Sequence, residues 1–186
     1  MSKTSKQGNK HSIIVGISVY ISVLITYYLS SKNVSIYYLK FDKFAIFAAG
    51  ISAALASQCE PIKSFKTGFD RVWATLLGII IGYPAAKIIV YLYLKFPHPL
   101  IFIPIISGIG TYLIFKLGYK ILGLPTPLVG TVAFLGLVIQ NPINTTELYA
   151  IGRFVATVIG VLIGVLVTVV FNVMKGFNRK WKKIYF

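Results

Sequence analysis

Two stretches of the chain repeat one pattern: residues 71–82 read RVWATLLGIIIG, and residues 153–164 read RFVATVIGVLIG. Arginine, alanine, threonine and two glycines occupy the same places in both stretches. Glycine and isoleucine matches are common in an apolar chain, but arginine occurs only three times here. The match between Arg71 and Arg153 is therefore informative, and we interpret the two stretches as an internal repeat.

The similarity extends upstream of both arginines. Residues 50–61 read GISAALASQCEP and residues 130–142 read GTVAFLGLVIQNP, one residue longer. The sequence therefore predicts two halves of three helices each, at 12–94 and 95–174. Because three is odd, the second half must enter a membrane from the opposite side, which is an inverted-topology repeat of the kind found in transporters.

Composition shows why a membrane is expected. Of the 186 residues, 56% are hydrophobic and 12% are charged, whereas a soluble domain carries about 25% charged residues. A spanning helix needs about 20 mostly apolar residues, so the chain has room for six spans and no separate soluble domain. We predict an all-α membrane protein with six transmembrane helices, at 12–30, 44–58, 71–94, 98–116, 121–140 and 151–174.

The positive charges indicate an orientation rather than a nucleic-acid partner. The net charge is +15, but the cations cluster at the ends of apolar runs. With the N-terminus inside, 13 Lys and Arg residues lie on the inner side and 5 on the outer side. Cytoplasmic loops carry the excess of such residues. We therefore expect a plasma-membrane protein with a basic cytoplasmic N-terminus at 1–11 and a basic, aromatic cytoplasmic tail at 175–186.

The repeated residues share one helix face in each half, because their spacing is four, three and four. Two interpretations stay open for them. The glycines are candidates for close helix packing, and the arginines, which we expect at the two opposite ends of the membrane, either attract an anion or anchor the helix at the interface. The residues concerned are Arg71, Thr75, Gly78 and Gly82, with Arg153, Thr157, Gly160 and Gly164.

Each half also contains one weak span. Only residues 44–57 of the second helix are cleanly apolar, and the fifth helix, 121–140, is interrupted by proline and glycine. Short or interrupted spans at matching positions of two halves point to a transport site, although two short helices in a packed bundle remain the alternative. Further polar candidates are Gln58, Gln140, Asn141 and Lys87 for substrate binding, and Glu60 for ion coupling.

With these residues the chain resembles the aromatic acid exporter and fusaric acid resistance (FUSC-like) membrane family. The resemblance covers about 12–175, and its carriers are Glu60-Pro61, Ser64-Phe65-Lys66, Arg71-x-x-Ala74-Thr75-x-x-Gly78, Arg153-Phe154-x-x-Thr157-x-x-Gly160 and Asn172. It implies a helical module, often a homodimer, that exports or conducts organic anions such as aromatic carboxylates. Two departures stand out: Ala74 replaces a frequent glycine, and the chain ends at Phe186 where members commonly continue into a cytosolic domain.

We therefore expect a membrane transporter or channel for small organic anions. The alternative is a non-transporting scaffold or regulatory subunit that serves a separately encoded cytosolic partner. Four acids, two histidines and one cysteine, scattered along the chain, form no catalytic set and no metal-ligand spacing. The sequence thus predicts no enzyme activity, no metal and no cofactor, and it gives no sign of nucleic-acid binding.

Overall fold

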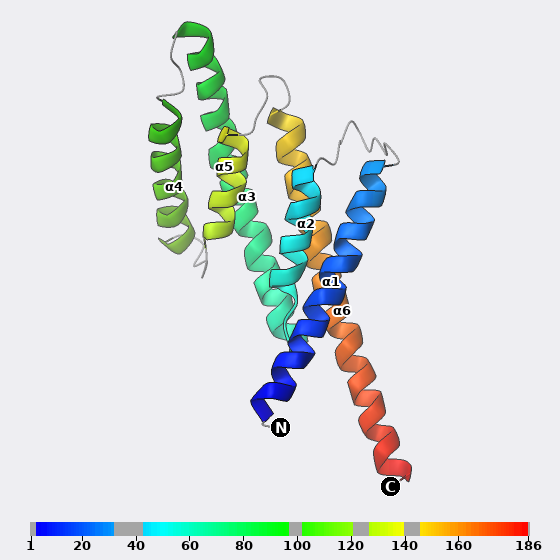
Figure 1. Ribbon diagram of the computed structural model, residues 1–186. Helices are drawn as coiled ribbons and strands as arrows, with labels where there is room; N and C mark the ends of the chain where they lie inside the picture. Colours follow the sequence, from blue (N-terminus) through cyan, green and yellow to red (C-terminus); the bar gives the residue numbers. More distant parts are fainter. Residues whose placement is uncertain (1–2, 32–42, 97–101, 121–126, 140–145, 186) are drawn as a thin grey trace. The chain divides into compact units, whose positions relative to one another are not determined.

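The computed structural model describes residues 3–31, 43–96, 102–120, 127–139 and 146–185, and these form helices with no strand (Figure 1). Hydrophobic side chains such as Tyr20, Ile80 and Leu162 lie exposed on the helix surfaces, as expected where lipid is the solvent. The described residues therefore confirm the all-α architecture. In chain order the helices are α1 (Lys3–Ser31), α2 (Lys43–Ala56), α3 (Pro61–Lys95), α4 (Phe102–Lys120), α5 (Leu128–Ile139) and α6 (Thr146–Tyr185).

Helices α3 and α6 are longer than the apolar runs that predicted them. Helix α3 begins at Pro61 rather than at 71, because proline fits the first helical position, where no backbone N–H is needed. Its first hydrogen bond runs from the Ser64 amide to the Glu60 carbonyl. Helix α6 begins at Thr146 and continues to Tyr185, through the stretch that we predicted as a tail beyond 174. Apolar periodicity marks the part of a helix in lipid, and the backbone helix continues past it.

Of the six helices that the described residues form, four are long and apolar enough to cross a membrane. Their spanning segments are His11–Ser30, Pro61–Leu92, Phe102–Lys120 and Glu147–Met174. The apolar parts of α2 and α5, Ala45–Ala56 and Leu128–Ile139, are shorter. Twelve helical residues extend about 18 Å, against about 30 Å of hydrocarbon. Within the described residues, the prediction of full spans therefore holds for four helices.

The chain divides into two compact units, and α3 and α6 each contribute to both. The first unit contains α1, α2, the start of α3 up to Phe69, and α6 from Ala156 onward. The second contains α3 from Asp70, α4, α5, and α6 up to Val155. The division falls two residues before Arg71 on α3 and directly after residue 155 on α6. Both repeat arginines therefore belong to the second unit.

Small residues bring α6 against α2 in the first unit. A Cβ added at Gly160 would collide with the carbonyl oxygen of Ala49, and one at Gly164 would lie 2.7 Å from that of Ala53. Helix α1 packs beside α2 with a fully buried stripe of four residues spaced four apart: Ile14, Ser18, Ser22 and Thr26. The Ser18 and Thr26 hydroxyls donate to carbonyls one turn earlier, which satisfies them without water.

A matching close approach joins α3 to α5 in the second unit. A Cβ added at Gly78 would collide with the carbonyl oxygen of Gly130, and one at Gly82 would lie 3.3 Å from the Cα of Phe134. The Phe134 ring is fully buried and lies against Gly110 of α4. A hydrophobic core forms around this contact from Ile89, Ile114, Phe134 and Val138. The helix carrying Arg71 is thus fixed along its glycine face.

Candidate functional site

The two repeat arginines are buried side chains of the second unit. Arg71 is 7% exposed and Arg153 is 8% exposed, although arginine is rarely buried in proteins. Their guanidinium groups are close enough for the charge of Arg153 to act on that of Arg71. Two like charges repel one another, and more strongly in a protein interior than in water. The fold therefore concentrates positive charge inside the protein.

This arrangement corrects the expectation that the arginines lie at opposite ends of the membrane. Arg71 follows the first residue of α3 by ten positions, which is about 15 Å of helix. Arg153 lies seven positions after the start of α6. Groups on opposite faces of a hydrocarbon layer about 30 Å thick would be too far apart for the charge of Arg153 to act on Arg71. The sequence repeat singled out both residues, but both helices begin earlier than their apolar runs indicate, so neither arginine lies at a helix end.

The neighbouring repeat residues are hydroxyl side chains one turn further along each helix. Thr75 is 1% exposed on α3, and Thr157 is 2% exposed on α6. Thr75 belongs to the second unit and Thr157 to the first. Threonine hydroxyls are hydrogen-bond donors and acceptors for oxyanions, so Thr75 adds to the second unit a group of the kind that anion binding requires.

Lys87, a predicted substrate-binding residue, forms an ion pair with Glu147, which the sequence analysis did not single out. Its ammonium lies 3.6 Å from Oε1 of Glu147 in the first turn of α6, and both side chains are more than half exposed. The Tyr83 hydroxyl donates to the same oxygen at 2.8 Å. The Lys87 ammonium also lies 5.4 Å from the centre of the Tyr83 ring. The i, i+4 spacing of Tyr83 and Lys87 was visible in the sequence, but their partner lies 60 residues or more away.

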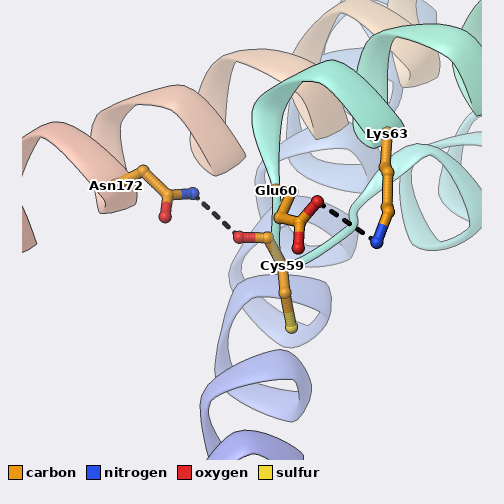
Figure 2. A network of polar contacts seen from close by, with 4 residues as sticks. All are labelled: Cys59, Glu60, Lys63 and Asn172. Atoms are coloured by element: carbon orange, nitrogen blue, oxygen red, sulfur yellow. Dashed lines mark hydrogen bonds and ion pairs between the residues drawn. The ribbon is translucent and has the colours of Figure 1, made fainter.

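Gln58 and Glu60 lie in the first unit, at the turn between α2 and α3. The Gln58 amide donates to the Leu55 carbonyl at 3.1 Å, near the end of α2. Glu60 is exposed and pairs with Lys63 at 3.2 Å (Figure 2). An exposed pair of this kind contributes little to stability. Gln140 and Asn141 lie outside the described residues.

Asn172 connects α6 to the same turn. Its side-chain amide donates to the Cys59 carbonyl at 3.1 Å, as Figure 2 shows, and to the Thr168 carbonyl at 2.8 Å. The Ser64 hydroxyl is buried, donates to the Ala56 carbonyl and lies 3.4 Å from the Thr168 hydroxyl. Ser64 and Asn172 both belong to the motifs quoted above. Their contacts hold the start of α3 against α6 in the first unit.

In the described part of the chain, no three His, Cys, Asp or Glu side chains group together. The second unit contains the buried guanidinium groups of Arg71 and Arg153 and, one helical turn from Arg71, the buried hydroxyl of Thr75. Guanidinium groups bind carboxylates through two parallel hydrogen bonds. This set is suited to holding an anion rather than to bond making or breaking.

Comparison with known proteins identifies the family of the chain. The family model described as fusaric acid resistance protein-like matches residues 34–167. The matched segment includes both arginines and both glycine faces. No curated protein and no solved structure matches the chain. With most of its length matched by the family model, the chain belongs to the fusaric acid resistance protein-like family, a family of membrane transport proteins.

Proposed function

We propose that this protein moves small organic anions, aromatic carboxylates among them, across the plasma membrane, and that Arg71 and Arg153 form one shared anion site. The observation that carries the proposal is the burial of two mutually repelling guanidinium groups in one unit. The fold concentrates this charge although burying a cation is costly. An anion bound between the arginines would offset the repulsion, so the site is complementary to negative charge.

Arginine is a better residue than lysine for such a site. Its guanidinium group stays charged and presents hydrogen-bond donors in a planar arrangement that fits a carboxylate. The Thr75 hydroxyl, one turn from Arg71, supplies a neutral donor. Because a transported anion must also leave, binding must be reversible, and hydrogen bonds with no covalent step meet that need.

The packing within each unit supports an inverted repeat. In the second unit Gly78 of α3 approaches the backbone of α5, and in the first unit the equivalent Gly160 of α6 approaches the backbone of α2. Each half of the sequence thus contributes its short helix to the long helix of the other half. Equivalent residues of an inverted repeat meet only near the membrane midplane. The proximity of Arg71 to Arg153 fits that arrangement.

The proposal includes an orientation and an assembly. The excess of Lys and Arg at the chain ends supports cytoplasmic termini. A homodimer follows from the family resemblance. Neither feature is needed for the anion site itself, whose residues come from α3 and α6 of a single chain.

Flux in proteoliposomes tests the proposal. Purified protein is reconstituted, and uptake of radiolabelled benzoate, succinate and chloride is measured for the wild type, Arg71→Gln and Arg153→Gln. Lys66→Gln is the matched control, because it removes an exposed cation from the same helix as Arg71. We expect each arginine variant to lower carboxylate flux at least about tenfold, which corresponds to about 1.4 kcal/mol, and the control to keep it.

Two results would contradict the proposal. One is flux that persists at the wild-type rate in both arginine variants. The other is correctly inserted wild-type protein that moves none of the anions, which would favour the scaffold for a separate cytosolic partner. Elution from a size-exclusion column and the circular dichroism spectrum establish that each variant is folded.

A further inference from the structure

The first turns of α6 are attached to the second unit by side chains outside the anion site. Residues 146–155 are the part of α6 that belongs to this unit, and they carry Arg153. Glu147 accepts a hydrogen bond from Tyr83 of α3 at 2.8 Å and lies 3.6 Å from the Lys87 ammonium. We name Tyr83, Lys87 and Glu147 the α3–α6 latch.

A second contact in the same segment fixes its rotation. The Tyr149 hydroxyl lies against α5, since a Cβ added at Gly136 would be 2.5 Å from it. Ala150 is 6% exposed and also faces inward. Glu147 contacts α3 and Tyr149 contacts α5, so the segment is held from two sides. Arg153 follows Glu147 by six residues, or about 9 Å along the helix.

The contacts of Glu147 and Tyr149 oppose the repulsion between the two arginines. The repulsion between Arg71 and Arg153 acts to separate the two helix segments that carry them. One anion can be bound by both arginines only if they stay close together, and this arrangement must already exist before the anion binds. Groups held in position beforehand bind more tightly, because less ordering accompanies binding. Contacts that resist the separation therefore favour anion binding.

We propose that Glu147, through its hydrogen bond with Tyr83 and its ion pair with Lys87, is a positioning residue that holds Arg153 beside Arg71. This inference rests on the proposed anion site and adds to it. Glu147 does not touch the anion. In this proposal Lys87 of α3 acts on the anion site indirectly, because its ammonium pairs with Glu147.

Hydrogen exchange tests the latch without any transport measurement. Amide exchange of residues 146–155 is followed by mass spectrometry in the wild type, Tyr83→Phe, Glu147→Ala and Glu147→Gln. Loss of the hydrogen bond is expected to speed exchange of this segment about threefold to tenfold, with residues 11–30 of α1 unchanged. Glu147→Gln keeps a carbonyl oxygen for the Tyr83 hydroxyl but loses the charge that pairs with Lys87, so its exchange should lie between those of the wild type and Glu147→Ala.

The matched control is Tyr91→Phe. Tyr91 lies on the same helix, and the Lys95 ammonium four residues later is 4.8 Å from its ring centre, as in the Tyr83–Lys87 pair. No contact between Tyr91 and α6 is among those of the described residues. This variant should leave exchange of residues 146–155 as it is in the wild type. A rise equal to that of Tyr83→Phe would show that loss of any such hydroxyl has this effect and would overturn the latch.

Carboxylate flux then tests the positioning role. Tyr83→Phe and Glu147→Ala should raise KM about threefold to tenfold and change the maximal rate less, and the KM of Glu147→Gln should lie between those of the wild type and Glu147→Ala. Unchanged exchange in Tyr83→Phe and Glu147→Ala overturns the latch. Faster exchange with an unchanged KM, where Arg153→Gln does raise KM, overturns the positioning role. Faster exchange in a protein that moves no anion supports the latch and refutes the proposed function alone.

Discussion

Replacing Gly78 with alanine should destabilise the second unit, because the added methyl group has no room. Its Cβ would collide with the Gly130 carbonyl, and a Cβ at Gly130 would in turn lie 2.5 Å from the Ala74 carbonyl oxygen. Both obstacles are backbone atoms, so α5 as a whole must move. Overpacking costs about 1–3 kcal/mol, and this contact belongs at the upper end. Alanine recovers about 1 kcal/mol through its higher helix propensity, which leaves a net loss of about 2 kcal/mol.

Thermal unfolding in detergent, followed by circular dichroism, measures the effect. For a chain of this length about 2 kcal/mol corresponds to a Tm lower by about 4–8 °C. Gly108→Ala is the matched control, because a Cβ at Gly108 in α4 meets nothing within 4 Å. Only the propensity gain then remains, and Tm should rise by about 2–4 °C. A Tm for Gly78→Ala at or above that of the wild type would refute the close approach of α3 and α5.

Three further outcomes are expected. Asn172→Ala removes the donor to the Cys59 carbonyl, so it should lower stability by about 1–2 kcal/mol and speed maleimide labelling of Cys59; unchanged labelling would contradict the contact. Glu60→Gln breaks only an exposed pair with Lys63, so its Tm should match the wild type, and a clear loss of Tm would count against that view. Arg71→Lys keeps the positive charge but lacks the paired donors of the guanidinium group, so it should retain more carboxylate flux than Arg71→Gln. Equal loss of flux in both variants would show that the positive charge at position 71 is not what anion binding chiefly requires.

The sequence predicted the six helices that the described residues form, in the order found, because lipid-facing segments must be apolar. It was less successful at their ends. The starts of α3 and α6 contain lysine, aspartate and glutamate, so the apolar pattern predicted loops there. In the structure both helices include these residues. The weak second and fifth helices were anticipated from their short apolar runs, and both are short in the structure.

The candidate site was predicted in part. The repeat singled out Arg71 and Arg153, but their proximity depends on how α3 and α6 cross, which no local pattern encodes. Glu147 was missed for a similar reason: its partners Tyr83 and Lys87 lie on another helix. An acid in the first turn of a helix is common, so nothing in the local sequence distinguished it.

The exchange of short helices between the two sequence halves has a consequence for biogenesis. Helix α2 packs on α6, which leaves the ribosome after the other described helices, and α3 packs on α5. The backbone of α2 near Ala49 and Ala53 is therefore without its packing partner until α6 has been synthesised. Neither half of the sequence is therefore expected to fold independently. A chain that stops early within α6 would leave α2 without the helix that packs against its backbone at Ala49 and Ala53.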